Sequence, residues 1–219
     1  MSMIDGDNFK DIYSFSGNDN FAKFFSSCNV IDTKNLILPA TTLTSNCYNS
    51  MFYNCTNLIS TPKLPAETLA YQCYANMFNA CSSLTTAPKL MATTLANYCY
   101  SYMFYNCTSL TTVQKRLPAT VLEGFCYMNM FNGCTSLTTA PELPAITLVS
   151  NCYLRMFYNC TNLSYIKAMF TSYPGGTYTD SWVENVASSG TFVKNSVAPW
   201  TITGNSAVPS GWTVVTADS

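Results

Sequence analysis

The stretch CYANMFNAC at residues 73–81 decides the fold of this 219-residue chain, because it belongs to a unit that recurs five times. The unit reads Cys-Tyr-x-x-Met-Phe-x-x-Cys-x-x-Leu, and its first cysteines are Cys47, Cys73, Cys99, Cys126 and Cys152. The steps between these cysteines are 26, 26, 27 and 26 residues. A fixed period of this length predicts a solenoid, in which each repeat packs mainly against its neighbours.

Apolar residues within one repeat are four residues apart, as at Leu69, Cys73, Met77 and Cys81. On a helical wheel they share one half of the surface, which predicts a helix with an inward face. We expect each helix to end just before the second cysteine, at Asn54, Ala80, Asn106, Gly133 and Asn159. Asn and Gly best tolerate the left-handed conformation that ends a helix.

A Thr-rich stretch such as residues 85–87 follows each predicted helix, and proline follows it at Pro62, Pro88 and Pro141. This pattern predicts one short strand per repeat, with the proline at its end. Stacked repeats would then form a one-sided parallel sheet with strands about 4.8 Å apart. The predicted fold class is therefore α/β.

Degenerate copies of the repeat at both ends predict caps. Residues 20–28 keep the final cysteine, and Trp182 and Val183 occupy the Met-Phe positions after the fifth repeat. Residues 190–193 and 211–215 are predicted to be closing strands. We therefore expect a single solenoid domain with an N-terminal cap and partial repeat (1–42), five full repeats (43–168), and a C-terminal cap with a partial repeat (169–219).

The order Cys-Tyr-x-x-Met-Phe-x-x-Cys-Thr-x-Leu, followed by Leu-Pro-Ala, resembles the BspA-type leucine-rich repeats. Cys-Tyr and Met-Phe replace the Ile-Gly and Ala-Phe that are more usual in that family, and the period is longer. The resemblance covers about residues 20–195, and residues 162–167 and 209–212 look like the end cap of gut-bacterial and gut-phage versions. It implies a leucine-rich-repeat solenoid used for surface adhesion or host attachment, and not for catalysis.

Composition excludes several classes of partner. Charged residues are 10% of the chain, the net charge is −1, and Lys and Arg form no run. Release of counter-ions from phosphates therefore cannot drive tight binding, and we expect no nucleic-acid partner. The sequence contains no run of 18 apolar residues, so we expect no membrane span. A polar, nearly neutral surface suits sugars or another protein.

The chemistry of catalysis and of metal binding is also missing. The chain has no histidine, and ten of its eleven cysteines follow a Cys-x7-Cys spacing unlike the Cys-x2-Cys of zinc sites. Predicted helices would hold these cysteines too far apart for disulfides, so we predict free, buried thiols. The acidic cluster Asp5, Asp7 and Asp11 lacks the order of a calcium loop. We expect no catalytic residue, metal or cofactor, and hence no enzyme.

A candidate contact surface lies on the outward side of the third and fourth repeats. Tyr98, Tyr102 and Tyr105 are spaced to form one stripe, with Phe125 and Met128 beside them. Such an aromatic patch with a polar rim indicates a contact with a ligand or a second subunit. The alternative is that a chain with 15 tyrosines simply places some of them outward.

A second outward column holds Lys63, Lys89, Lys115 with Arg116, and then Glu142. We interpret these charges as a solvated edge that discourages strand pairing. The additional residue near Arg116 accounts for the single 27-residue step and predicts a local bulge.

The expected function is attachment, by a virion fibre or decoration protein of a phage that contacts a polysaccharide or protein on the bacterial surface. A homo-oligomer, trimeric in a fibre, is a further expected partner. Residues 1–11 lack the basic start and apolar stretch of a secretory signal, which fits assembly in the host cytoplasm and location in the virion. The alternatives are an adhesin on the bacterial cell surface and a scaffold module with no external ligand.

Overall fold

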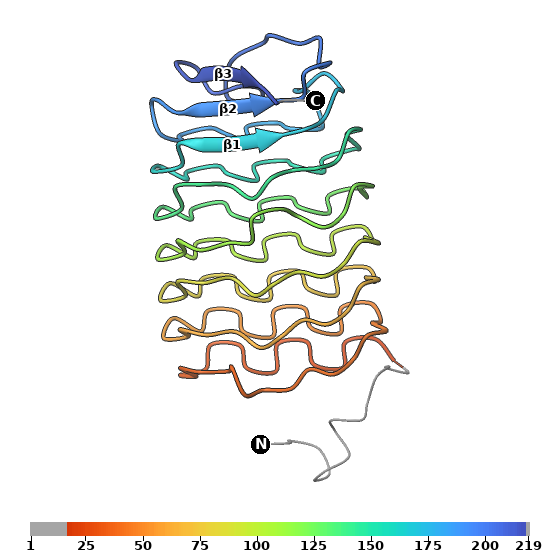
Figure 1. Cartoon of the computed structure of the whole chain (residues 1–219). Helices are drawn as coiled ribbons and strands as arrows, with labels where there is room; N and C mark the ends of the chain where they lie inside the picture. Colours follow the sequence, from red (N-terminus) through yellow and green to blue (C-terminus); the bar gives the residue numbers. More distant parts are fainter. Residues whose placement is uncertain (1–16, 218–219) are drawn as a thin grey trace.

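The computed structural model describes residues 17–217, which form a stack of rungs with one rung per repeat (Figure 1). The strands are β1 (Tyr165–Ala168), β2 (Thr191–Lys194) and β3 (Thr213–Thr216), which pair in parallel in the order β1-β2-β3. Earlier rungs pair through isolated parallel bridges, such as Thr86 with Thr112. The chain is thus a solenoid-like repeat, and closing strands form at the two predicted places with slightly shifted bounds.

The predicted helices are wrong for residues 17–217, where no helix is present. Residues 71–80 form successive turns, and every fourth residue has a positive φ: 52° at Gln72, 56° at Asn76 and 60° at Ala80. The predicted left-handed residue before the second cysteine does exist, but it ends a series of turns. We call these segments, at residues 45–54 and their equivalents in the other rungs, the turn segments.

Two alternating sets of backbone hydrogen bonds hold a turn segment. The N–H of Met77 donates to the carbonyl of Tyr74 in the same rung at 3.3 Å. The N–H of the next residue, Phe78, donates to the carbonyl of Met103 in the following rung at 3.0 Å. Because this alternation continues along the segment, the backbone is bonded both to itself and to its neighbour, as buried peptide groups require.

The strict spacing of four explains why a helix was predicted and why none forms. An α-helix has 3.6 residues per turn, so its inward positions alternate between steps of three and four. Here the large buried side chains come in pairs four residues apart: Cys73 with Tyr74, and then Met77 with Phe78. A period of exactly four residues fits a turn segment that repeats every four residues better than it fits a helix.

The left-handed positions carry suitable residues in most rungs. The five full repeats have fifteen such positions, of which seven hold Asn and one holds Gly133. Most other L-residues lose roughly 1–2 kcal/mol in this conformation, whereas Asn and Gly adopt it more readily. The positions are Asn46, Ser50, Asn54, Gln72, Asn76, Ala80, Tyr98, Tyr102, Asn106, Phe125, Asn129, Gly133, Asn151, Arg155 and Asn159.

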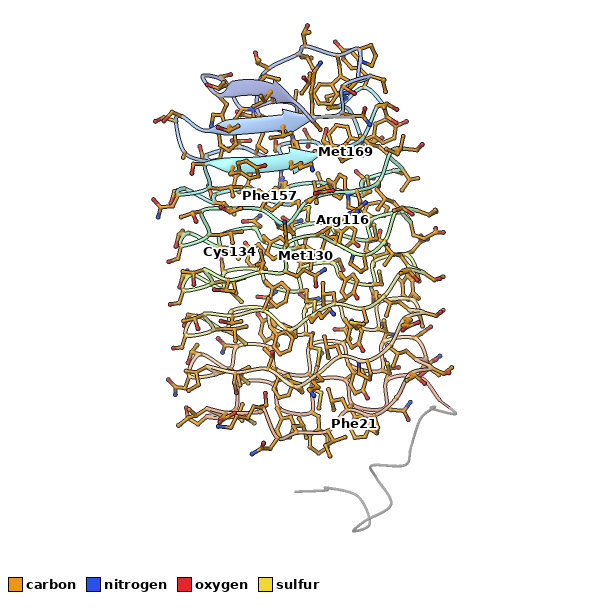
Figure 2. The ribbon with its side chains drawn as sticks, viewed as in Figure 1. Phe21, Arg116, Met130, Cys134, Phe157 and Met169 are labelled. Atoms are coloured by element: carbon orange, nitrogen blue, oxygen red, sulfur yellow. The ribbon has the colours of Figure 1, made fainter. Side chains whose placement is uncertain are left out.

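Two ladders of parallel aromatic rings run through the core beneath the turn segments (Figure 2). The tyrosine ladder has ring centroids 5.7–5.9 Å apart, and the phenylalanine ladder of the full repeats has centroids 5.5–5.7 Å apart. Phe21 and Phe25 extend the ladders at the N-terminal end, and Trp182 stacks on Tyr153 at the other end. Offset stacking of this kind adds to the stabilisation from burial alone.

The cysteines form two further columns, and all eleven are free thiols, as predicted. Ten are buried and Cys28 is exposed. The thiol of Cys107 donates to the carbonyl of Phe78, in the preceding rung, at 3.1 Å, and the other second cysteines repeat this contact. The thiol therefore serves as a small apolar group that also satisfies a buried carbonyl.

Burial changes the acid–base behaviour of these thiols. Desolvation raises the pKa of Cys47 and Cys152 to about 11, and that of Cys81, Cys99 and Cys160 to about 12. It also raises the pKa of the ladder tyrosines above the ordinary value. The acidic cluster at Asp5, Asp7 and Asp11 lies outside the described residues.

Candidate binding surfaces

Each rung presents two different surfaces to solvent. The turn face consists of the outward side chains of the turn segments. The β face consists of the outward side chains of the segments that pair through bridges and β1, at residues 59–65, 85–91, 111–117, 138–143 and 164–168. The aromatic residues predicted as a contact surface lie on the turn face, and the charged column lies on the β face.

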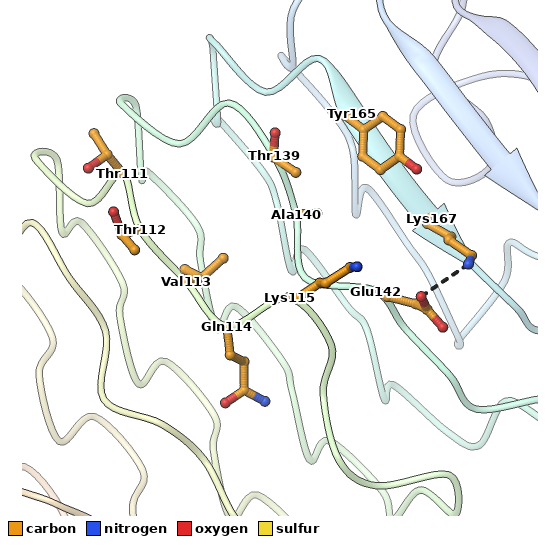
Figure 3. Close-up of a pocket in the computed structure, with 10 residues that line it drawn as sticks. All are labelled: Thr111, Thr112, Val113, Gln114, Lys115, Thr139, Ala140, Glu142, Tyr165 and Lys167. Atoms are coloured by element: carbon orange, nitrogen blue, oxygen red, sulfur yellow. Dashed lines mark ion pairs between the residues drawn. The ribbon is translucent and has the colours of Figure 1, made fainter.

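The β face contains a groove of about 370 Å³ that crosses three rungs (Figure 3). Residues 111–115 line it from one rung, Thr139, Ala140 and Glu142 from the next, and Tyr165 and Lys167 from β1. Successive rungs supply these residues because bridges hold Thr139 beside Tyr165 and Arg116 beside Glu142. The groove is thus built by register between rungs and not by a loop.

Some polar groups of this groove are fixed by hydrogen bonds within the protein, and others have no partner within residues 17–217. The Gln114 side chain accepts a hydrogen bond from the Leu90 N–H and donates to the Arg116 carbonyl, both at 2.7 Å. The hydroxyls of Thr112 and Thr139 have no hydrogen-bond partner within residues 17–217, and both residues are exposed. The ring of Tyr165, which is 36% exposed, lines the same groove, and Tyr165 pairs with Thr139. These groups are available to a ligand.

Glu142 organises the charges at one end of the groove. Its Oε2 lies 3.1 Å from Lys167 Nζ (Figure 3). Its Oε1 lies 3.4 Å from Arg116 Nε. The Glu142 side chain is only 19% exposed, whereas that of Arg116 is 56% exposed. Glu142 therefore forms ion pairs with Arg116 of the preceding rung and with Lys167 of β1.

A second groove of about 450 Å³ lies on the β face two rungs nearer the N-terminus. Its walls are mostly apolar, with Pro62, Pro65, Pro88 and Met91, and Lys63 and Lys89 also line it. The charged column thus runs from one groove to the other, and its cations Lys63, Lys89, Lys115 and Arg116 are exposed. The exposed cations fit the predicted solvated edge, whereas the half-buried Glu142 does not, and the sequence analysis missed both grooves.

The predicted aromatic residues form two separate pairs on the turn face. Tyr98 stacks on Phe125 with centroids 4.4 Å apart, and the Tyr102 and Tyr105 rings are tilted at 5.6 Å. Met128 adjoins Tyr102 through its carbonyl, which accepts the Tyr102 N–H at 2.8 Å. All five residues are half-buried, so the patch is less exposed than the outward helical stripe that we predicted.

Two further aromatic residues belong to these surfaces and were missed by the sequence analysis. Tyr71 packs edge-on against Tyr98 at 5.9 Å and is 46% exposed. Tyr165 lies in the β-face groove, and its position two residues after Leu163 could have indicated an outward strand position. The helix prediction concealed Tyr71, because it assigned contacts by a wheel that the turn segments do not follow.

The described residues contain no helix with the length and apolar character needed to cross a bilayer. They also contain no group of three or more Cys, Asp or Glu side chains arranged to hold a metal ion. No protein-family model, curated protein or solved structure matches the chain. Any function must therefore be argued from the surfaces themselves.

Proposed function

We propose that this chain is a non-enzymatic binding solenoid that attaches a phage particle to a polysaccharide on the surface of its bacterial host. The observation that carries the proposal is the groove at residues 111–115, which an exposed tyrosine ring and unoccupied threonine hydroxyls line together. Sugar rings bind proteins through this combination, because their C–H faces pack on aromatic rings while their hydroxyls exchange hydrogen bonds.

The rigidity of the groove supports the proposal. Gln114 is fixed by two hydrogen bonds, and Glu142 is held between Arg116 and Lys167. A ligand that enters such a groove immobilises few side chains, which lowers the entropic cost of binding. Repetition of the surface along the stack also suits a repeating polymer.

The resemblance to BspA-type leucine-rich repeats supports attachment as the biological role. Assignment to that family, and the choice between a phage fibre and a bacterial surface adhesin, are parts of this proposal. The five-fold order of Cys-Tyr, Met-Phe, Cys and Leu supports the family assignment. A fibre would carry several copies of the chain, so that weak single sites add up to firm attachment.

A scaffold role is the second candidate, and strand β3 favours it. Val214 and Val215 of β3 are 45% and 44% exposed, and within residues 17–217 β3 pairs only with β2. An open, apolar strand edge is a template for pairing with another chain. Light scattering over a range of concentrations, with Val214→Lys as the variant, would reveal assembly through this edge.

The experiment that tests attachment is binding of labelled protein to intact gut bacterial cells, with and without their capsular polysaccharide. We expect capsule-dependent binding that Tyr165→Ala weakens about tenfold, since a stacked ring contributes roughly 1–2 kcal/mol. Tyr173→Ala is the matched control, because Tyr173 is 61% exposed and lies outside the groove. Binding that persists without the capsule, or that Tyr173→Ala weakens equally, would contradict the proposal.

A further inference from the structure

We infer that the β face binds an acidic polysaccharide, whose carboxylates lie along the column Lys63, Lys89 and Lys115. This inference rests on the proposed function and narrows its ligand from polysaccharides in general to anionic ones. It assigns a role to charges that the sequence analysis interpreted only as a solvated edge.

The first step is the register of the column. The parallel bridge from Leu64 to Leu90 places Lys63 beside Lys89 in adjacent rungs. Lys115 lies in the next rung, after the additional residue that follows Thr112, so it is offset from this pair. Adjacent strands of a sheet are about 4.8 Å apart, so like charges face each other at short range. Such cross-strand pairs of like charge are unfavourable without a counter-charge.

The second step is that the column lacks this counter-charge within the protein. No carboxylate lies within ion-pair distance of Lys63, Lys89 or Lys115 in residues 17–217. Glu142, the acid of the column, is already engaged by Arg116 and Lys167. Three exposed ammonium groups in consecutive rungs therefore remain without an ion-pair partner in residues 17–217, on a protein whose net charge is −1.

The third step concerns the apolar and aromatic surface that lies between the charged side chains. Pro62, Pro88 and Met91 provide an apolar floor in the groove that Lys63 and Lys89 line, and Tyr165 provides a ring in the other groove. A glycan presents both kinds of surface, since its rings have C–H faces and its acid groups project from them. An acidic polymer laid along the stack would meet a cation in each of three rungs and an apolar contact at each end.

The few cations favour a glycan over a nucleic acid. Nucleic-acid binding draws on the release of many counter-ions, and three lysines release too few to hold a polyphosphate firmly at physiological salt. A glycan with widely spaced carboxylates gains from apolar contact as well as from charge. Its binding should therefore weaken only modestly as salt rises.

The test compares polygalacturonate with its fully methyl-esterified, uncharged form by calorimetry on the full chain. Lys63→Gln/Lys89→Gln removes two charges from the column. Lys23→Gln/Arg155→Gln removes the same charge from the turn face, and single-stranded DNA is the polyanion control. Thermal unfolding checks that both double variants fold, as expected for exposed side chains. We expect binding of the acidic form only, weakened about tenfold by the column variant and unchanged by the turn-face variant.

The other outcomes are distinguishable. Equal binding of the acidic and esterified forms, equal effects of the two double variants, or tighter binding of DNA would overturn the inference. Capsule-dependent attachment to cells would then still support the proposed function. Loss of attachment to cells together with no binding of either polysaccharide would overturn both.

Discussion

The turn face and the β face of the same rungs differ in how much irregularity they accept. On the turn face, left-handed residues keep their positions through the 27-residue step, from Tyr98 to Phe125 and from Tyr102 to Asn129. On the β face, Thr112 still pairs with Thr86, which lies 26 residues earlier. The additional residue is therefore absorbed after Thr112, among the side chains that line the groove.

The hydrogen bonds around the additional residue show why the β face tolerates an insertion. The Leu90 N–H donates to the side-chain amide of Gln114, where Leu143 donates to a backbone carbonyl of the next rung at 2.9 Å. A side chain thus replaces a backbone partner at the bulge. The turn face has no such slack, because almost every N–H there is bonded within its rung or to the next. We therefore expect the residues of a binding site to vary on the β face, where a side chain can replace a lost backbone hydrogen-bond partner.

The largest effect should come from raising the pH, because the thiols and tyrosines beneath the turn face cannot ionise while folded. Their pKa values are raised by burial, so this stability is present below pH 9 and is lost as the unfolded state ionises above it. Above pH 9, each buried thiol therefore lowers the free energy of unfolding by about 1.4 kcal/mol per pH unit. The five thiols with pKa values of about 11 or 12 together cost about 7 kcal/mol at pH 10.

Urea unfolding at pH 7, 9 and 10 in the presence of a reductant measures this loss. Cys28→Ser is the control, because Cys28 is exposed whereas the other ten cysteines are buried. An unfolding free energy at pH 10 equal to that at pH 7 would mean that the cysteine columns are accessible to solvent, and would break the distinction between the two faces.

The next largest effect should come from interrupting a ring ladder. Phe78→Ala is expected to lower the free energy of unfolding by about 3–5 kcal/mol, since it leaves a cavity between Phe52 and Phe104. Tyr102→Ala, on the outer side of the same turn face, should cost about 1 kcal/mol or less. Urea denaturation of both variants decides the matter, and equal losses would show that inward and outward positions have been confused.

A smaller effect distinguishes turns from a helix. Gln72 has a φ of 52°, so Gln72→Gly is expected to stabilise the protein by up to about 1 kcal/mol. Ala75 is buried and has no positive φ, so Ala75→Gly should destabilise it by about 1 kcal/mol. In a helix both changes would destabilise. Thermal unfolding of the two variants therefore separates the structures, and far-ultraviolet circular dichroism should show no helical signal.

The smallest effect is expected on the β face. Glu142→Gln removes two partly exposed ion pairs and should change the free energy of unfolding by less than about 1 kcal/mol. Thermal unfolding of this variant measures the change. A loss above about 2 kcal/mol would show that side chains of the β face contribute to stability as much as those beneath the turn face. The change also frees Arg116 and Lys167, which should strengthen binding of an anion.

The sequence predicts those features that depend on which residues repeat, and fails where backbone conformation is at issue. The repeat predicted the solenoid, the buried cysteines and the strands at the C-terminal end. It predicted helices wrongly, because a spacing of four is close to the 3.6 residues of a helical turn. Asn76 and Asn129, which stand in the middle of the predicted helices, could have indicated left-handed turns there.

The candidate site was harder to predict for a different physical reason. Tyr98 and Phe125 are close because they share a column, which the period alone reveals. The β-face grooves depend on where a bulge begins and on which lysines find a carboxylate, and neither is written in the repeat. Glu142 meets Lys167 only because the register shifts by one residue between Thr139–Tyr165 and Leu143–Ala168.

Hydrogen bonds between adjacent rungs also affect how the number of repeats can change during evolution. Each rung bonds only to the rungs before and after it, so stability accumulates rung by rung and needs no contact between the two ends. Recombination between the second and third repeats would add or delete one whole rung and leave both caps intact. The number of lysines in the β-face column would change by the same event. The reach of the molecule along a polymer can therefore change in a single generation, without any new side chain having to arise.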